Sequence, residues 1–374
     1  MSEVAAGGTF LRRLTLGRFR NYTELSWRPE GRIVVITGAN GSGKTNLLEA
    51  ISFLVPGRGL RGARIGEVAQ AGTAAWAVNG RFDSADGPLE IATGTTPESP
   101  DRRVFRLDGA TPRNQAELGA RLSAVWLTPQ MDRLFQEGAS GRRRFLDRLV
   151  YALEPGHARE IGSHDTAMAG RNRLLAEGRR DLAWLAGLED SMARHAVAAT
   201  AARMALVTRL NAADLSGAFP RARLGLLCPI AERLASAPAL AVEDWVRSEL
   251  ATSRQSDAAS SSSSVGAHRS DLAMADAATS LPAAQASTGQ QKALLIGVIL
   301  AHAALLADLR GAAPLLLLDE PAVHLDPDRR AALFAALAPL PAQVFLTGTD
   351  ADIFQSLNAQ ASFWRTGGDA LHGG

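Results

Sequence analysis

The chain has 374 residues, of which 46% are hydrophobic and 21% are charged, so it is long enough for about two or three domains with a buried core. Its 40 basic and 38 acidic residues nearly balance, and a net charge of +2 does not by itself indicate nucleic-acid binding. The single cysteine, Cys228, excludes an intramolecular disulfide framework and a zinc cluster. We find no signal peptide and no run of about 18 apolar residues, and we expect a cytoplasmic protein without a membrane span.

The first part of the chain has the pattern of several strands around one glycine-rich turn. Ile33–Thr37 is a run of mostly β-branched residues, which predicts a buried strand, and helical spacing follows from Lys44 to Leu54. The other strands predicted in this part are Phe10–Phe19, Tyr22–Trp27, Trp76–Phe82, Leu89–Thr93 and Val104–Leu107.

Near residue 130 the pattern becomes helical. Apolar residues recur at helical spacing from Arg142 to Leu215, with breaks expected at Pro155-Gly156 and Gly178, and Arg179–Leu210 is expected to pair with the preceding helix. The serine-rich stretch Ser256–Ser264 is predicted to be a flexible loop.

The last part of the chain returns to alternating helices and strands, and its glycine-rich C-terminal residues are expected to be frayed. The predicted helices are Gln290–Leu309 and Arg329–Leu337, and the predicted strands are Leu315–Leu318 and Val344–Thr347.

The strongest motif is the glycine-rich turn, which reads Gly38-Ala39-Asn40-Gly41-Ser42-Gly43-Lys44-Thr45. It matches the phosphate-binding loop G-x-x-x-x-G-K-[ST], and it lies between a predicted strand and a predicted helix as that loop requires. Loop amides and the helix N-terminus favour phosphate oxygens. Lys44 is predicted to bridge the β- and γ-phosphates of ATP, and the Thr45 hydroxyl to bind Mg²⁺.

A second motif supplies carboxylates at the end of an apolar strand. Leu315–Leu318 is followed by Asp319-Glu320-Pro321. Asp319 is predicted to hold Mg²⁺ at the carboxyl end of the strand, and Glu320 is predicted to act as general base toward the attacking water. The alternative is an Asp-Glu pair that starts a surface turn, which the four leucines directly before it oppose.

The segment Ser287-Thr288-Gly289-Gln290 opens a predicted helix shortly before the acidic strand. It resembles the signature motif of ABC-type ATPases, in which Ser287, Gly289 and Gln290 would cap the γ-phosphate of ATP bound by the other subunit. The resemblance therefore implies a head-to-tail homodimer with two ATP molecules in its interface. Taken alone, a serine here is also an ordinary helix N-cap. Lys44 and Lys292, the two lysines of the chain, both fall in these motifs.

Three further positions fit the same plan. Asp326, in His324-Leu325-Asp326, resembles the D-loop, whose aspartate contacts the facing active site. Gln130 stands where the Q-loop would place an amide that senses Mg²⁺ and water. Thr347 ends the last strand where transporter ATPases carry a switch histidine, and it could orient water there. For each position an ordinary loop residue is an equal alternative.

Two arginine clusters are candidates for DNA binding. Arg58 and Arg61 follow the helix after the glycine-rich turn, and Arg142 and Arg143 open the helical region. Arginines that contact phosphate oxygens bind without reading sequence, so such binding should be sensitive to salt. The alternative is a solvated basic face paired with nearby acids.

Over nearly its full length the chain resembles the RecF family of bacterial recombination and repair ATPases. The likeness rests on Phe19–Tyr22, Gly38–Ile51, Arg142–Asp147, Gly266–Leu272 and Gln343–Phe345. It implies an α/β fold, an ABC-type P-loop ATPase head similar to SMC heads, with a mainly helical second lobe and no long coiled coil. Residues 1–130 and 300–374 would form the ATPase lobe, and residues 131–299 the helical lobe with the signature motif.

The resemblance also implies what ATP does. ATP would join two copies into a clamp on double-stranded and gapped DNA, and hydrolysis would release it. The protein would act with RecO and RecR in recombinase loading and replication restart, in connection with the SOS response. Arg20 or Asn21 would touch the base or ribose of the nucleotide, although a plain β-turn is an equal alternative.

The alternative function is the ATPase subunit of an ABC transporter. The absent switch histidine and the long separation between Lys44 and Ser287 oppose it. A structural SMC-type arm protein is a third possibility, and the helical region is far too short for a long coiled coil.

Overall fold

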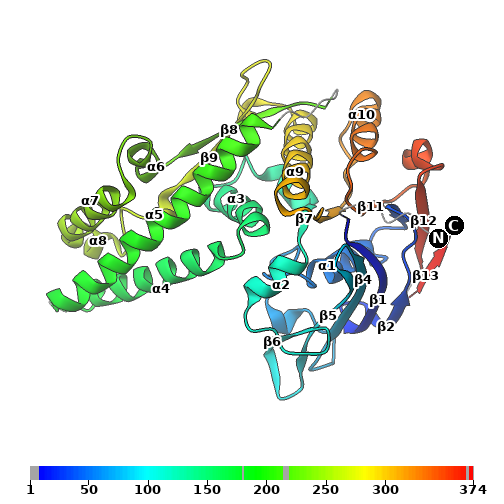
Figure 1. Ribbon diagram of the computed structural model, residues 1–374, viewed down its shortest axis with the longest axis horizontal. Coiled ribbons are helices and arrows are strands. Elements are labelled where there is room, and N and C mark those ends of the chain that lie inside the picture. The colour runs from blue at the N-terminus through cyan, green and yellow to red at the C-terminus, as the bar shows by residue number, and fades with distance from the viewer. Residues whose placement is uncertain (1–7, 179–180, 214–218, 368–369, 374) are drawn as a thin grey trace. The chain divides into compact units, whose positions relative to one another are not determined.

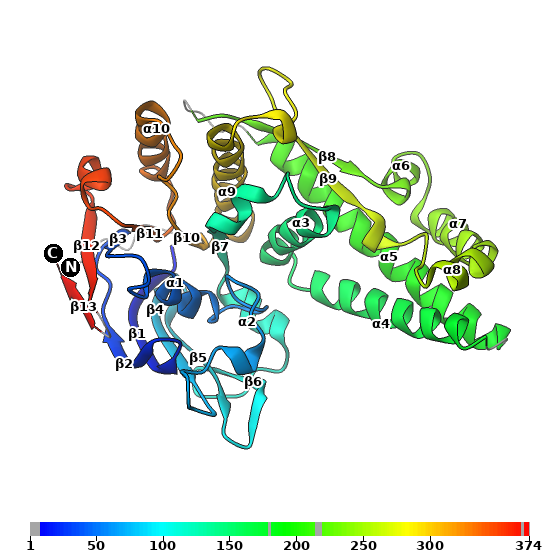
Figure 2. The same ribbon diagram turned by 180° about the vertical axis from the view of Figure 1, so that it is seen from behind.

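The computed structural model describes residues 8–178, 181–213, 219–367 and 370–373, and the chain divides into two compact units (Figures 1 and 2). The first unit contains Met1–Asp132, Asp214–Arg221 and Ala286–Gly374, and the second contains Arg133–Ala213 and Ala222–Gln285. This division differs from the predicted lobe boundary at residue 299, because it places residues 286–299 in the first unit. Residues 1–7, where a signal peptide would begin, and residues 179–180 and 214–215 of the expected helical stretch lie outside the described residues.

The central sheet of the first unit has six strands in the order β13-β12-β3-β11-β10-β7. All neighbours in it run parallel except β12 and β13, and every residue of β7, β10 and β11 is buried. The β-branched and leucine-rich runs of the sequence therefore form central strands buried on both faces. Its strands are β3 (Ile33–Thr37), β7 (Ala124–Leu127), β10 (Leu315–Leu318), β11 (Val344–Gly348), β12 (Ala361–Gly367) and β13 (Ala370–Gly373).

A second, antiparallel sheet of the first unit has the order β2-β1-β4-β5-β6. Its strands are β1 (Phe10–Phe19), β2 (Tyr22–Trp27), β4 (Ala77–Ser84), β5 (Gly87–Thr96) and β6 (Ser99–Leu107). Helix α1 (Lys44–Ser52) packs on β1 and β4 of this sheet and on β11 of the central sheet. The helix and these three strands contribute residues to one hydrophobic core. Three aromatic rings in edge contact, Phe19, Phe53 and Trp76, secure the end of α1.

Three more helices complete the first unit: α2 (Gln115–Arg121), α9 (Thr288–Arg310) and α10 (Pro327–Leu337). Its short 3-10 turns are η1 (Ile65–Glu67) and η5 (Asp352–Leu357). The turn η2 (Pro129–Arg133) ends on the first residue of the second unit, and η4 (Ala283–Gln285) belongs to the second unit. Helix α9 is long and apolar enough to cross a membrane, because a stretch of 18 residues in it has a mean hydropathy of 1.9. However, 72% of that stretch is buried inside the protein. It is the core helix of its unit, packed against α10 and β7.

The second unit is mainly helical, as predicted. Helices α4 and α5 form the expected hairpin around the break at Gly178, whose φ of +65° lies in the left-handed region that glycine adopts readily. Its elements are α3 (Ala139–Leu153), α4 (His157–Ala176), α5 (Leu182–Ala212), α6 (Pro229–Leu234), α7 (Ala239–Thr252), α8 (Arg254–Ser260), η3 (Ala267–Arg269) and the hairpin strands β8 (Ala222–Leu227) and β9 (Asp271–Asp276).

Two predictions about local structure are wrong. The serine-rich stretch is not a flexible loop: it includes most of α8, and the buried Asp257 and Ser263 both bond to the buried guanidinium of Arg171. A buried arginine requires such partners, so it orders the segment. The described C-terminal residues, up to 367 and from 370 to 373, are not frayed either, because β12 pairs in parallel with β3 and β13 pairs with β12.

Candidate nucleotide site

The strands β3, β11, β10 and β7 all end at one edge of the central sheet because they are parallel neighbours. Gly38 follows β3, Asp319 follows β10, and Gln130 lies just beyond β7, while Thr347 is the penultimate residue of β11. Ligands of such sheets bind outside the carboxyl ends of the strands. The sheet order therefore brings four motifs together that are far apart in the sequence.

The phosphate-binding loop has the backbone that its glycines predict. Gly38 has a φ of +152° and Gly43 a φ of +98°, both in the region that favours glycine. A Cβ on Gly38 would lie 2.2 Å from Thr366 Oγ1, and one on Gly43 would lie 2.7 Å from the Tyr22 hydroxyl. Ser42 Oγ also bonds to Thr366 Oγ1 at 2.6 Å. The loop is thus fixed from outside by β12 and by the β1–β2 turn.

Lys44 is buried at the start of α1, with its ammonium inside the loop. Its Nζ donates to the carbonyl oxygens of Gly38 at 2.7 Å and Ala39 at 2.9 Å. Burial lowers the pKa of Lys44, and the carboxylates of Glu320 and Asp319 act in the opposite direction. A cation held by two carbonyl oxygens beside two acids is placed to exchange those oxygens for phosphate oxygens.

Asp319 bonds directly to Thr45, so two of the predicted Mg²⁺ ligands are in contact. Thr45 Oγ1 donates to Asp319 Oδ1 at 3.1 Å, and Thr347 Oγ1 donates to the same oxygen at 2.7 Å. Asp319 and Thr347 are both buried. A hydroxyl and a carboxylate in contact form the oxygen-rich pair that Mg²⁺ prefers in proteins, so the residues present fit this ion.

Glu320 has an unusual backbone, with a φ of +50°. Its N–H donates to Thr347 Oγ1 at 2.9 Å, and its carbonyl oxygen accepts a hydrogen bond from Lys292 Nζ at 2.8 Å. Thr347 thus bonds to both acidic residues of the motif. The contact of Lys292 with Glu320 was not predicted from the sequence, whose only signal was that arginine replaces lysine nearly everywhere else in the chain.

The signature segment caps its own helix. Ser287 Oγ accepts from the Gln290 N–H at 3.3 Å, and Gln290 Oε1 accepts from the Ser287 N–H at 2.9 Å, which makes a capping box at the start of α9. A Cβ on Gly289 would lie 2.6 Å from the carbonyl oxygen of His324. The signature and the predicted D-loop therefore touch through a glycine that admits no side chain.

The D-loop and Q-loop residues lie on the surface. Asp326 caps α10 by accepting from the Arg329 N–H at 2.8 Å, and its side chain is 48% exposed. Gln130 is exposed in η2. The candidates for the nucleotide base are engaged elsewhere: Arg20 bonds to both oxygens of the buried Glu49, and Asn21 accepts from Asn46 at 2.6 Å.

The four arginines predicted to bind DNA differ in how they are engaged. Arg58 is exposed. Arg61 bonds to Asn46 Oδ1 at 2.6 Å and lies 3.1 Å from Glu49 Oε2. In the second unit, Arg142 makes two bonds to Asp271, at 2.7 and 2.8 Å, and Arg143 donates to the Ser270 carbonyl at 2.9 Å. Three of the four guanidinium groups thus hold together their own unit.

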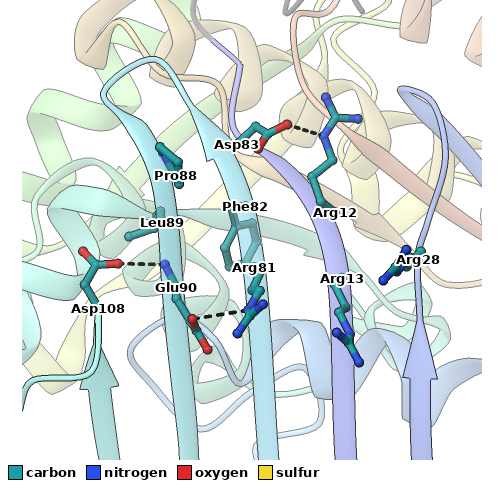
Figure 3. Close-up of a pocket in the computed structure, with 10 residues that line it drawn as sticks. All are labelled: Arg12, Arg13, Arg28, Arg81, Phe82, Asp83, Pro88, Leu89, Glu90 and Asp108. Carbon is teal, nitrogen blue, oxygen red and sulfur yellow. Dashed lines mark hydrogen bonds and ion pairs between the residues drawn. The ribbon is translucent and has the colours of Figure 1, made fainter.

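A pocket of about 800 Å³ lies on the antiparallel sheet, away from the phosphate-binding loop (Figure 3). Among its arginines, Arg12 pairs with Asp83 at 2.7 Å and Arg81 lies 3.3 Å from Glu90. Arg13 donates to Ser26 Oγ. The pocket lies near the start of β1, whereas the nucleotide site adjoins the other end of this strand. There Tyr22, which follows the β1–β2 turn, bonds to the Gly43 carbonyl, so the pocket is not part of the nucleotide site. The lining residues are Arg12, Arg13, Arg28, Arg81, Phe82, Asp83, Pro88, Leu89, Glu90 and Asp108.

Comparisons with known proteins agree on one family. The model of the RecF/RecN/SMC N-terminal domain matches residues 10–366. The chain is 47% identical to the DNA replication and repair protein RecF of Mesorhizobium japonicum, over 95% of each chain. It is 48% identical to that of Allorhizobium ampelinum, over 95% of this chain and 96% of the relative.

Solved structures agree on the fold. The structure of the recombination mediator protein RecF-ATPrS of the RecFOR pathway matches with a TM-score of 0.84 at 21% identity, over 98% of each chain. An Smc head domain from Pyrococcus furiosus matches with a TM-score of 0.52 at 15% identity, over 98% of this chain and 96% of that one.

Proposed function

This chain belongs to the RecF family of DNA replication and repair proteins, which are ABC-type ATPases, and from that premise we propose how it uses ATP. ATP and Mg²⁺ bind at the edge of the central sheet. Two copies then close head-to-tail over double-stranded DNA at single-strand gaps, and hydrolysis opens them again. This cycle would support recombinase loading with RecR and RecO, replication restart and the SOS response in the cytoplasm.

The observation that supports nucleotide use most directly is the assembly of Lys44, Thr45 and Asp319. Asp319 is distant in the sequence from Lys44 and Thr45, yet it bonds to Thr45 and its charge acts on the ammonium of Lys44. Mg²⁺ would be held by the Thr45 hydroxyl and by Asp319, and Gln130 is exposed at the same edge as a further amide ligand. The ion neutralises charge on the β- and γ-phosphates when bound.

Glu320 is the proposed general base. It follows Asp319 directly, and its charge acts on Lys44, so its carboxylate is near the phosphate-binding loop. Its role would be to orient water and accept its proton. Lys44 would release the Gly38 and Ala39 carbonyls and bind the phosphates. The remaining loop residues, Ala39 to Gly43, would contribute N–H groups.

Support for the dimer comes from the exposed start of α9. Ser287 and Gln290 lie on the surface, and the N-terminus of a long helix attracts anions. Asp326 is exposed at the adjoining D-loop, which Gly289 contacts. A second copy could therefore receive both motifs at its γ-phosphate. Opening the capping box would free Ser287 and Gln290 for that contact.

DNA contact would be made through backbone phosphates. Of the four predicted arginines, Arg58 and Arg61 are both exposed, but Arg61, like Arg142 and Arg143, would have to leave partners within the protein first. Binding would weaken steeply with salt and depend little on sequence.

The test is the variant Glu320→Gln, which keeps the size of the side chain and removes the base. With ATP and duplex DNA it should remain a dimer, while ATP turnover falls at least about 100-fold, within the range that general-base catalysis contributes. Sedimentation and phosphate release would be measured together. A variant that hydrolyses ATP at the normal rate would remove Glu320 from this role, and one that stays monomeric with ATP bound would overturn the clamp.

A further inference from the structure

Lys292 contacts three motifs at once. It lies in α9 shortly after Ser287, and its side chain is 1% exposed. Its ammonium donates to the carbonyl oxygen of Glu320 at 2.8 Å and lies 3.3 Å from Asp132 Oδ2, in the turn that carries Gln130. All these residues belong to the first unit. One buried cation thus joins the signature helix, the acidic motif and the predicted Q-loop.

The carbonyl that Lys292 holds belongs to a residue with a rare backbone. A φ of +50° is sparsely populated for residues other than glycine, and it persists only where the surroundings hold it. For Glu320 two side chains do so. Thr347 accepts the N–H on one side of the residue, and Lys292 donates to the carbonyl oxygen on the other.

The charges around Lys292 indicate that its ammonium is held for a purpose other than packing. A buried ion pair is often no more stable than apolar residues of the same volume, so stability alone does not account for a lysine at this position. Asp132 faces Lys292, and its second oxygen, Oδ1, is buried without a hydrogen-bond partner among the described residues. The carboxylate of Asp132 therefore balances the charge of the Lys292 ammonium. The shorter hydrogen bond of that ammonium, at 2.8 Å, is the one to the Glu320 carbonyl.

We propose that Lys292 is a positioning residue for ATP hydrolysis, which fixes the left-handed backbone of Glu320 and ties it to the signature helix. This inference rests on the proposed role of Glu320 as base. Ser287 caps the start of α9, and Lys292 lies in the first turns of the same helix. A shift of this helix on contact with a second copy would therefore move the hydrogen bond that Lys292 donates to Glu320. Hydrolysis would then respond to dimer formation within the same subunit, through one side chain.

The experiment compares Lys292→Met with a matched control. Methionine keeps the length of the side chain and removes the donor and the charge. Gln291→Met is the control, because Gln291 is the adjacent buried polar residue on α9 and donates only to the Ala286 carbonyl among the described contacts. For each full-length protein three quantities are measured: affinity for a fluorescent ATP analogue, turnover at saturating ATP with duplex DNA, and hydrogen exchange of the segment from Asp319 to Leu325.

We expect Lys292→Met to bind the analogue within about twofold of the parent and to lose at least about tenfold in turnover. Exchange in the 319–325 segment should rise, while that of the phosphate-binding loop stays unchanged. The control should keep turnover within about twofold. If the single variant does not fold because Asp132 is left unpaired, the double variant Lys292→Met/Asp132→Asn removes both charges, and the same losses are expected.

Normal turnover and normal exchange in Lys292→Met, together with an inactive Glu320→Gln, would overturn this inference and leave the proposed function standing. Equal losses in the Gln291→Met control would also overturn it, because they would show a general effect on α9. Normal turnover in Glu320→Gln would instead refute the base assignment itself, whatever Lys292→Met does.

Discussion

Thr347 and Asp319, at the ends of neighbouring strands β11 and β10, share a hydrogen bond of 2.7 Å that is fully buried. The same threonine oxygen accepts the N–H of Glu320 at 2.9 Å. Thr347 therefore holds both residues of the acidic motif through one hydroxyl group. Its place at the sheet edge follows from the parallel register of β10 and β11.

The first prediction concerns this bond. Thr347→Val keeps the shape of the side chain, removes the donor to Asp319 and leaves the Glu320 N–H without its acceptor. A hydrogen bond to a charged group contributes about 1.5–3 kcal/mol, so the Mg²⁺ concentration for half-maximal ATP turnover should rise about tenfold or more. Turnover titrated with Mg²⁺ checks this, and Thr347→Ser, which keeps the hydroxyl, should behave like the parent. An unchanged Mg²⁺ requirement in the valine variant would contradict it.

The second prediction separates ATP binding from dimer formation. Ser287→Arg places a large cation at the start of α9, where a second copy would bring its own γ-phosphate and cationic loop. Monomers should bind ATP with unchanged affinity but fail to dimerise, as measured by sedimentation with ATP in a Glu320→Gln background. Ser287→Thr keeps an N-cap and should dimerise normally. Dimers of the arginine variant would show that this helix end does not face a neighbour.

The third prediction compares two arginines of one cluster. Arg58→Ala should weaken binding to duplex DNA and lower the slope of log affinity against log salt by about one, since one phosphate contact is lost. Arg61→Ala should leave that slope unchanged, because Arg61 is engaged with Asn46 and the buried Glu49. Fluorescence anisotropy at several salt concentrations measures both. The reverse ranking would reassign the DNA contact to Arg61.

The fourth prediction is a pH dependence of the helical unit. Burial lowers the pKa of His268 from 6.5 to about 4, while its bond to the Ser263 carbonyl acts in the opposite direction. The other charged or titratable groups that act on it are His164, Arg269 and Arg143. As the pH falls, the His268 imidazole is therefore protonated in the unfolded chain before it is protonated in the folded protein. As the pH falls from about 6.5 toward 4, stability is lost, and above pH 6.5 this contribution is complete.

At pH 5 the His268 contribution should lower the free energy of unfolding by about 2 kcal/mol relative to pH 8. His268→Asn keeps a donor for the Ser263 carbonyl and does not titrate, so the difference between parent and variant should shrink by that amount between the two pH values. Urea unfolding at pH 5 and pH 8 measures it. A constant difference would contradict the shifted pKa.

Local patterns were sufficient for much of the fold. Strands β1, β2, β3 and β10 have the bounds that the sequence predicted, because each is a short apolar or alternating run between turn residues. The phosphate-binding loop and the acidic motif could also be recognised in the sequence, since their chemistry requires fixed residue types in adjacent positions. The family could be inferred from these blocks in order.

The local motifs thus predicted which residues carry the chemistry of nucleotide binding. The tertiary structure alone decided their partners: Arg142 meets Asp271, Lys292 meets Asp132 and Glu320, and Arg171 orders the serine-rich segment. It also placed the C-terminal strands β12 and β13 beside β3. The physical reason is that an ion pair or a strand pairing between distant segments depends on how the chain closes in space. The conformation of a short run of residues can be predicted from that run alone. The distant group that balances its charge or completes its hydrogen bonds cannot be predicted in this way.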